Sequence, residues 1–250
     1  MSYLLEVKNL SKTFKNLKAV DDVSFKVNDG EIVGLLGENG AGKTTTLRMI
    51  ATMLRPTSGT ANINNKDIVK NPEEARGEIG ILFGGEVGLY DRLTGRENIV
   101  YFGELNGMTR EEASKSVDIL SKEFEMEEYI DKRCGKFSKG MKQKISIARS
   151  LVHSPKLMLL DEPTSGLDVT ATNIIQDFIF KCKKEGKAIV FSSHTMSEVE
   201  KLCDRVVIIH KGKLVENETL ADLRTKYKDT SLEEIFVNLI GVKGGRENEK

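Results

Sequence analysis

The feature that most constrains this chain is a glycine-rich segment that matches the pattern GxxxxGK[ST] in full, Gly37-Glu38-Asn39-Gly40-Ala41-Gly42-Lys43-Thr44. An apolar run, Ile32–Leu36, precedes it, and a helix-forming run, Thr45–Ile50, follows it. A strand, a loop and a helix in this order form the context that the pattern requires. Glycines let the backbone turn tightly, so that several amide groups can face one polyphosphate. The segment therefore predicts a nucleotide-phosphate site.

Each side chain of this loop has an expected task. We expect Lys43 to reach the β- and γ-phosphates and the Thr44 hydroxyl to ligate Mg²⁺. The start of the following helix adds about half a positive charge. The alternative interpretation, a chance glycine-rich turn, does not explain the full match in its strand–helix context. The predicted nucleotide contacts of the loop are Gly37, Asn39, Gly40, Ala41, Gly42, Lys43, Thr44 and Thr45.

A second motif is an apolar strand that ends in two acids, Leu157-Met158-Leu159-Leu160-Asp161-Glu162-Pro163. We predict that Asp161 holds the Mg²⁺ shell and that Glu162 polarises the attacking water as a general base. Pro163 helps to stop the strand. The alternative interpretation of the segment is a strand that runs into an acidic turn. Beside a phosphate-binding loop, the catalytic interpretation is favoured.

Short apolar runs alternate with amphipathic stretches along the chain, which predicts an α/β fold with a mainly parallel central sheet. The turn residues Asn28-Asp29-Gly30 suggest a hairpin and an antiparallel strand group near the N-terminus. Helices are expected to begin near Gly42, Gly95, Arg110, Lys139, Val169 and Ser197. Strands are expected at Leu4–Val7, Val23–Val27, Ile32–Leu36, Ala61–Ile63, Ile79–Phe83, Leu157–Leu160, Ala188–Ser192 and Val206–His210.

The 250 residues suit one domain, 1–250, whose middle differs from the rest. Arg96–Leu105 and Arg110–Phe124 have the spacing of two amphipathic helices, with no convincing strand among residues 91–137. We therefore expect a helical subdomain at 91–137 inserted in an α/β core of residues 1–90 and 138–216. Residues 217–250 are expected to form a C-terminal helical extension and tail, with short amphipathic helices at Thr219–Leu223 and Ser231–Ile240.

Composition gives no support to several classes of protein, although a local basic patch remains compatible with the bulk charge. Lys and Arg together number 38, as do Asp and Glu, so the net charge is zero, whereas duplex-DNA binding normally needs a basic excess. Three cysteines, Cys134, Cys182 and Cys203, lie far apart, which indicates reduced thiols and not a disulfide framework or zinc site. The chain has no apolar run of 18 residues, so a membrane function needs another polypeptide for the membrane part.

Upstream of the acidic strand lies a further candidate anion site. Phe137-Ser138-Lys139-Gly140-Met141 opens the helix that runs on to His153. A Ser-x-Gly opening offers a hydroxyl, bare amides and the helix dipole to an anion. By itself this segment would more often be an N-capped basic surface helix. Its position between the other two motifs favours the functional interpretation.

The ordered set of motifs resembles the ABC ATPases, over residues 3–216. The set comprises the phosphate-binding loop, the Ser138 helix, the Leu-Leu-Asp-Glu-Pro strand, Ser165-Gly166-Leu167-Asp168, and Ser192-Ser193-His194. The resemblance implies a P-loop NTPase with ABC ATPase fold that hydrolyses ATP with Mg²⁺. It also implies a homodimer formed through ATP and a transmembrane permease subunit as partner. The expected location is cytoplasmic, peripheral on the inner face of the cell membrane.

In this family two domains meet head to tail, and each ATP lies between the phosphate-binding loop of one chain and the Ser-x-Gly helix of the other. The resemblance implies that Ser138 and Gly140 contact the γ-phosphate across the dimer. It places Asp168 in the loop that links the two sites and makes His194 the sensor of the γ-phosphate. Phe14 falls where an aromatic ring usually stacks on adenine. Taken alone, Phe14 could be an edge-strand aromatic residue and His194 a capped histidine at the core edge.

Two departures from the family pattern stand out. Lys139 replaces the first glycine of the usual Leu-Ser-Gly-Gly-Gln motif, and it either points outward or adds charge to the nucleotide across the interface. Gly85 falls where the family generally has a metal-contacting glutamine. Either Glu86 substitutes, or a water does, or the metal contact is weaker. The segment 84–94 also resembles the sodium-extrusion (Nat-type) branch of bacterial ABC exporters, which favours export.

Two other classes of function are less well supported by the sequence. A soluble ABC protein acting on ribosomes normally carries two cassettes, and the DNA-repair type has a long coiled coil between its motifs. Here one cassette is present, and no such insertion separates Lys43 from Ser138. A nucleotide kinase would carry an acceptor-binding lid where this chain has a second phosphate-binding motif. We expect no nucleic acid as partner, and His153 and His210 are interpreted as structural.

Overall fold

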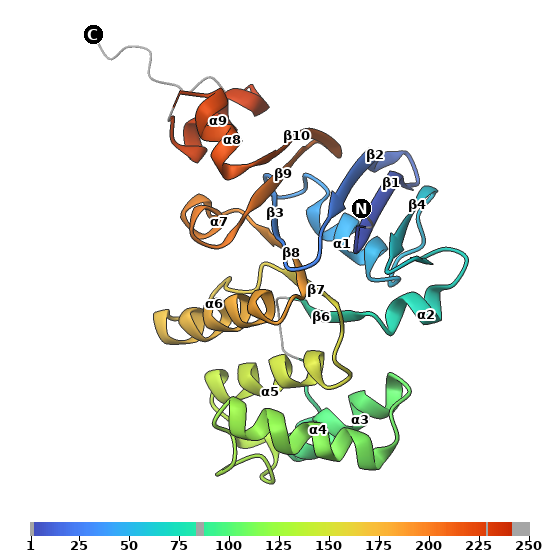
Figure 1. The fold of residues 1–250 in the computed structure, drawn as a ribbon, viewed down its shortest axis with the longest axis vertical. Coiled ribbons are helices and arrows are strands. Elements are labelled where there is room, and N and C mark those ends of the chain that lie inside the picture. The colour runs from blue at the N-terminus through green and yellow to red at the C-terminus, as the bar shows by residue number, and fades with distance from the viewer. Residues whose placement is uncertain (1–2, 84–87, 229, 242–250) are drawn as a thin grey trace.

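The structure is a computed structural model that describes residues 3–83, 88–228 and 230–241. Within them, six strands form a central sheet in the order β10-β9-β3-β8-β7-β6, which runs through the middle of Figure 1. All neighbouring strands in this sheet are parallel except β10, which pairs antiparallel with β9. The strands are β3 (Ile32–Leu36), β6 (Ile79–Phe83), β7 (Leu157–Asp161), β8 (Ala188–Ser193), β9 (Arg205–His210) and β10 (Lys213–Thr219). The prediction of an α/β fold with a mainly parallel sheet is confirmed.

The antiparallel strand group near the N-terminus is also confirmed. Its strands pair in the order β2-β1-β4-β5 and lie beside α1, at the upper right of Figure 1. They are β1 (Leu5–Phe14), β2 (Leu17–Val27), β4 (Ser58–Ile63) and β5 (Lys66–Asp67). β1 and β2 are longer than expected because repeated register shifts, one of them beside the left-handed Asn9, interrupt the apolar alternation of β1.

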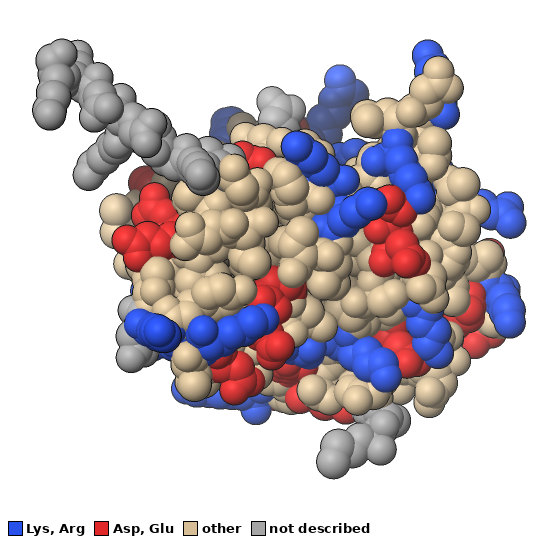
Figure 2. Space-filling view, turned by 90° about the horizontal axis from the view of Figure 1, so that it is seen from above, with Lys and Arg blue, Asp and Glu red and all other residues tan. Residues whose placement is uncertain are grey.

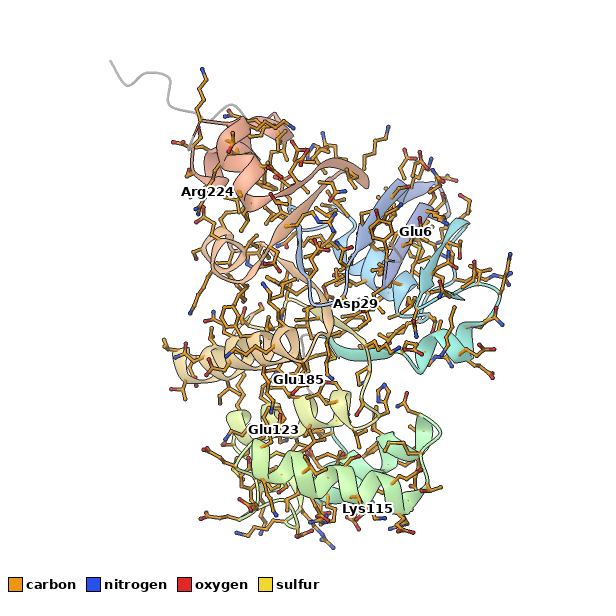
Figure 3. The ribbon with its side chains drawn as sticks, in the orientation of Figure 1. Glu6, Asp29, Lys115, Glu123, Glu185 and Arg224 are labelled. Carbon is orange, nitrogen blue, oxygen red and sulfur yellow. The ribbon has the colours of Figure 1, made fainter. Side chains whose placement is uncertain are left out.

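The hairpin predicted at Asn28-Asp29-Gly30 is wrong. That turn, where Figure 3 labels Asp29, joins β2 to β3, and these strands belong to different sheets. In the N-terminal antiparallel sheet, the hairpins turn at Lys15-Asn16 and at Asn64-Asn65. Both asparagines of the second turn have positive φ, 47° and 64°, as a tight two-residue turn requires.

Helices lie on both faces of the central sheet, with α1 on one side and α3 to α9 on the other. They are α1 (Lys43–Ile50), α2 (Pro72–Arg76), α3 (Gly95–Leu105), α4 (Arg110–Glu123), α5 (Lys139–Leu151), α6 (Val169–Lys184), α7 (Met196–Leu202), α8 (Leu220–Lys226) and α9 (Leu232–Ile240). The starts of most predicted helices agree to within one residue. Two elements were not predicted. β10 has a polar sequence, and it extends past residue 217, where the C-terminal extension was expected to begin. α2 has only five residues.

Two apolar cores lie on opposite sides of the central sheet. On β3, Ile32 and Leu36 face the core shared with α3 to α9, while Val33 and Leu35 face α1 and the antiparallel sheet. Every residue of β3, β7 and β8 is buried, as expected for parallel strands covered on both faces. Because these strands are parallel, their carboxyl ends meet at one edge of the sheet, where the loops that follow them come together.

The helical region 91–137 begins with well-capped helices. Thr94 with Glu97, and Thr109 with Glu112, form capping boxes at the starts of α3 and α4. Helix α5, assigned to the core by its position in the sequence, packs against α3 and α4 as well as against β6 and α6. In Figure 1 these three helices form the lower part of the molecule, opposite α1.

Charged side chains of both signs lie on the surface that faces the viewer in Figure 2, around a broad uncharged area. Lys and Arg side chains alternate there with Asp and Glu side chains, in keeping with 38 residues of each sign. No helix among the described residues is long and apolar enough to cross a membrane.

Candidate functional site

The glycine-rich loop leaves β3 at Leu36 and enters α1 at Lys43. Two of its glycines have no room for a side chain. A Cβ at Gly37 would lie 2.4 Å from the carbonyl oxygen of Ile209, and one at Gly42, where φ is 110°, would lie 2.6 Å from that of Ala19. A Cβ at Gly40 would have no other atom within 4 Å. The loop is therefore packed tightly against the protein at Gly37 and Gly42 and is open between them.

The ammonium group of Lys43 lies inside this loop. It donates hydrogen bonds to the carbonyl oxygens of Gly37, at 2.6 Å, and Glu38, at 3.1 Å. Burial lowers the pKa of Lys43 from its ordinary value, and nearby carboxylates, first that of Glu162, act in the opposite direction. A cation held in this position, among the loop amides and at the start of α1, fits a polyphosphate.

A hydroxyl and a carboxylate meet beside the loop. The Thr44 hydroxyl donates to Asp161 Oδ1 at 3.0 Å, although the two residues belong to α1 and β7. The Ser192 hydroxyl, at the end of β8, donates to the same oxygen at 2.6 Å. Hydroxyl and carboxylate oxygens are hard ligands of the kind that Mg²⁺ prefers. The donors that the sequence assigned to a metal are therefore in contact, and they fit a Mg²⁺ ion.

Glu162 and His194 form a pair at the same edge of the sheet. Glu162 Oε1 lies 3.2 Å from His194 Nδ1, and both side chains are partly exposed. Glu162 has a φ of 46°, a left-handed conformation that is uncommon for a residue with a side chain. Its amide donates to the Ser192 hydroxyl at 2.9 Å, which holds this conformation in place. The structure thus brings Lys43, Thr44, Asp161, Glu162 and His194 to one place.

Ser138 is at the start of α5, away from that cluster. Its hydroxyl caps the helix by accepting from the amide of Met141 at 3.2 Å. A Cβ at Gly140 would meet nothing within 4 Å, so this helix start is open. In Figure 1, α5 and α1 are separated by the lower strands of the central sheet. Within one chain, Ser138 and Gly140 are therefore not brought to the phosphate-binding loop.

The two remaining polar positions of this region, Lys139 and Asp168, lie at the starts of α5 and α6. Asp168 caps α6, accepting from the amide of Ala171 at 2.8 Å. Lys139 donates from its ammonium group to the carbonyl oxygen of Gly166, just before Asp168. Neither of the two expectations for Lys139 included this contact. The lysine joins the start of α5 to the segment that leads into α6.

Phe14 closes the hairpin between β1 and β2, opposite Leu17. Its side chain is exposed, and the Lys12 ammonium lies 5.3 Å from the ring centroid. An exposed ring is free to stack on a planar base.

The prediction for Gly85 and its alternative Glu86 falls outside the described residues. The three other loop positions, Asn39, Ala41 and Thr45, lie in the loop and the first turn of α1.

The two other histidines lie in different surroundings. His210 Nδ1 is 3.5 Å from Glu38 Oε2, next to the phosphate-binding loop. His153 Nε2 is 3.1 Å from the carbonyl oxygen of Ile79, and burial lowers the pKa of His153 from its ordinary value. The structural interpretation of both histidines stays a prediction, and His210 is the one that lies next to the phosphate-binding loop.

Sequence reasoning overlooked the contribution of Ser192. Its hydroxyl connects Asp161 Oδ1 with the amide of Glu162, so that it links the end of β8 to both acids at the end of β7. The available signal was its position, because a hydroxyl residue at the end of one strand can bond to the end of the neighbouring strand. Ser192 pairs directly with Asp161 in the parallel register.

A groove of about 1080 Å³ separates β6 from the helical region. Phe102 lines this groove and makes an edge-to-face contact with Tyr101, which makes another with Tyr90, the ring centroids being 6.0 and 5.6 Å apart. The Arg149 guanidinium lies 4.1 Å from the centroid of Phe102, and burial lowers its pKa from the ordinary value. Besides Phe102 and Arg149, the lining includes Leu105, Lys142, Ser146 and Glu162, so the groove extends to the edge of the catalytic cluster.

The fold and the site together define a nucleoside-triphosphatase of the P-loop class. A glycine-rich loop between a central parallel strand and a helix carries Lys43, and two acids end a nearby strand. This arrangement binds a nucleotide polyphosphate and places a carboxylate beside it.

Comparisons with known proteins identify the family within this class. Residues 20–165 match the family model described as "ABC transporter". The chain is 50% identical over 224 residues to the ABC transporter ATP-binding protein NatA of Bacillus subtilis (strain 168), covering 90% of this chain and 91% of NatA. It is 41% identical over 219 residues to the bacitracin transport ATP-binding protein BcrA of Bacillus licheniformis, covering 86% of this chain and 70% of BcrA.

A solved structure described as the ATP-binding subunit of an ABC transporter superposes with a TM-score of 0.84 at 34% identity. The match covers 94% of this chain and 99% of that one. This chain therefore belongs to the ATP-binding subunits of ABC transporters, which are ATPases coupled to transport.

Proposed function

We propose that two copies of this chain bind two ATP molecules between them and hydrolyse them at composite sites. The observation that carries this proposal is the contact between Glu162 and His194, beside the Thr44–Asp161 pair and the Lys43 ammonium. All these groups belong to one phosphate-binding edge, whereas the open helix start at Ser138 lies elsewhere in the same chain. A second copy placed head to tail would bring its Ser138 helix to the first copy's nucleotide.

The proposed chemistry assigns a task to each group of the edge. Lys43 donates to the β- and γ-phosphate oxygens in place of the carbonyls that it contacts now. Glu162 accepts a proton from the attacking water, and His194 donates to the γ-phosphate. Thr44 and Asp161 would hold Mg²⁺, which would neutralise part of the phosphate charge.

Four further residues complete the proposed composite site. Ser138 and Gly140 of the opposing copy contact the γ-phosphate through a hydroxyl and an open helix start. Asp168, near the junction of the two sites, links one site to the other. Phe14 stacks on adenine with its exposed face.

ATP-dependent dimerisation tests this proposal directly. The Glu162→Gln variant, in which hydrolysis is slowed, is expected to double its mass from 27.8 kDa when Mg-ATP is added. The same variant carrying Ser138→Arg is expected to bind ATP and remain monomeric, because the arginine fills the opposing helix start. Static light scattering with a parallel ATP-binding measurement distinguishes the two states.

A matched control separates the interface from simple loss of a helix cap. Ser231 caps α9 in the same way, accepting from the amide of Glu234 at 3.3 Å. Glu162→Gln with Ser231→Arg is therefore expected to dimerise. A Glu162→Gln chain that binds ATP and stays monomeric would contradict the homodimer, and ATP-dependent dimers of the Ser138→Arg chain would contradict the role of Ser138.

We further propose that the chain is peripheral at the membrane and that its ATP hydrolysis drives a separate permease subunit, which exports sodium. The groove beside α3 and α5 supports a docking site, because Phe83, Phe102 and Phe137 line it and it reaches Glu162 at the catalytic edge. The 50% identity to NatA over most of both chains supports the Nat-type branch. The sodium cargo itself rests on the resemblance of residues 84–94.

Transport in vesicles tests the partner and the cargo together. Inside-out vesicles that contain the chain and its cognate permease are expected to accumulate labelled sodium when ATP is added. The Lys43→Met chain, with the same permease, is expected to show no accumulation. If the permease retains the chain on the membrane and stimulates its ATPase but no sodium moves, the sodium cargo is wrong and the permease partner stands.

A further inference from the structure

Glu198 is a buried carboxylate close to the catalytic edge, for which the proposed chemistry has no task. It lies in the first turn of α7, and 8% of the residue is exposed. Both carboxylate oxygens accept a hydrogen bond: Oε1 from the Thr164 hydroxyl and Oε2 from the Ser193 hydroxyl, each at 2.7 Å. Hydrogen bonds from hydroxyl groups to a carboxylate are stronger than those between neutral groups, and burial protects them from competition by water.

The two hydroxyls belong to the two segments that carry the catalytic pair. Thr164 is two residues after Glu162, and Ser193 directly precedes His194. The Ser193 hydroxyl also accepts from the amide of Thr195 at 3.0 Å, so the backbone on the far side of His194 is attached to the same group. One carboxylate therefore connects the segment that follows Glu162 with both neighbours of His194.

This connection complements the one made by Ser192. Ser192 joins β8 to Asp161 and to the amide of Glu162, on the strand side of the pair. Glu198 joins the same two segments through Ser193, the last residue of β8, and Thr164, which lies three residues after the end of β7. The 3.2 Å contact between Glu162 Oε1 and His194 Nδ1 is thus flanked by a hydrogen-bonded bridge on each side.

Helix α7 has apolar contacts with the core that do not involve Glu198. Val199 and Leu202 of the same helix are 0% and 2% exposed and pack in the core beneath it. Burying a carboxylate is costly unless it is fully hydrogen-bonded, and an apolar residue at this position would avoid that cost. The two bridging hydrogen bonds are therefore what distinguishes glutamate from an apolar residue here.

We infer that Glu198 is a positioning residue for ATP hydrolysis, which acts by holding Glu162 and His194 at a fixed separation. The inference rests on the proposed roles of that pair. A carboxylate that orients a general base through intervening hydroxyls contributes to the rate of the chemical step and not to the affinity for the nucleotide.

The variants to compare are Glu198→Ala, Glu198→Gln and a matched control at Glu216. Glu216 is also 8% exposed and also accepts two side-chain hydrogen bonds, from Lys226 at 2.7 Å and Tyr227 at 3.1 Å, but it lies on β10 beside α8. Loss of a buried carboxylate is common to both positions. Of these two glutamates, only Glu198 contacts the segments that carry Glu162 and His194.

Steady-state kinetics should separate rate from binding. Glu198→Ala is expected to lower kcat by about 10- to 100-fold, the range for a misplaced catalytic group, with KM and Kd for ATP within about 2-fold. Glu198→Gln, which keeps the size and one acceptor oxygen, is expected to recover part of this loss. Glu216→Ala is expected to lower the unfolding temperature while kcat stays near the unmodified value. A normal kcat in folded Glu198→Ala overturns the inference.

A double variant distinguishes this inference from the proposed function on which it rests. If Glu198 acts through Glu162, adding Glu198→Ala to Glu162→Gln is expected to cause little further loss of kcat. Full additivity of the two losses would mean that Glu198 acts independently and would overturn the inference. If Glu162→Gln alone has normal turnover, the proposed role of Glu162 fails, whatever Glu198 does.

Discussion

Replacing Glu162 with glutamine is expected to slow ATP hydrolysis by about 100- to 10,000-fold, the usual contribution of a positioned general base. That loss corresponds to about 3–5 kcal/mol of activation barrier. The amide keeps the size of the side chain and can still bond to His194, but it cannot accept a proton from water. ATP affinity should change little, because the phosphate-binding loop and Lys43 are untouched.

Single-turnover kinetics with labelled ATP measures this loss apart from product release. Glu185→Gln is a matched control, since it makes the same chemical change at an exposed residue beyond α6, where Figure 3 labels it. The control should hydrolyse ATP at the normal rate. Near-normal turnover of Glu162→Gln would rule out Glu162 as the general base.

Replacing Lys43 with methionine is expected to weaken ATP binding by about 10- to 100-fold. Hydrogen bonds to charged groups contribute about 1.5–3 kcal/mol, and each 1.4 kcal/mol is a factor of ten in affinity. The ammonium is already inside the loop, bonded to the carbonyls of Gly37 and Glu38, so no large movement is needed to reach a phosphate. Methionine fills similar space and removes the charge.

Titration calorimetry with ATP and Mg²⁺ gives the affinity, and circular dichroism checks that the variant is folded. Lys115→Met is the control, because it changes the net charge equally on α4, at the bottom of Figure 3 and away from the loop. Lys115 takes part in an exposed ion pair with Glu111, a kind of contact that contributes little to stability. An unchanged ATP affinity in folded Lys43→Met would exclude Lys43 from the phosphate site.

The helix starts show what local sequence predicts well. Thr94, Thr109, Ser138 and Asp168 each accept from an amide in the first turn of the following helix. These residue types are strongly preferred at the N-cap, and the contact spans three residues at most. Helix starts at Gly95, Arg110, Lys139 and Val169 were therefore predictable without knowledge of the fold.

The N-terminal strands show where local sequence was insufficient. The turn residues at Asn28-Asp29-Gly30 have the composition of a hairpin, yet the chain there passes from one sheet to the other. Nothing within the turn distinguishes the two outcomes, because the partners of β3 are β8 and β9, far along the chain. The irregular pairing of β1 similarly depends on neighbours on both sides, β2 and β4.

The sequence by itself determined the phosphate-binding loop, the acids that end β7 and the order of the motifs, because each is encoded in a few consecutive residues. Only the tertiary structure decided how those motifs meet. The bridge from Thr164 to Ser193 through Glu198 and the contact of Lys139 with Gly166 join residues 27 to 34 positions apart. The contact between Thr44 and Asp161 spans 117 positions. Such contacts follow from the order β9-β3-β8-β7, which brings the carboxyl ends of parallel strands to one edge through pairings that no short segment specifies.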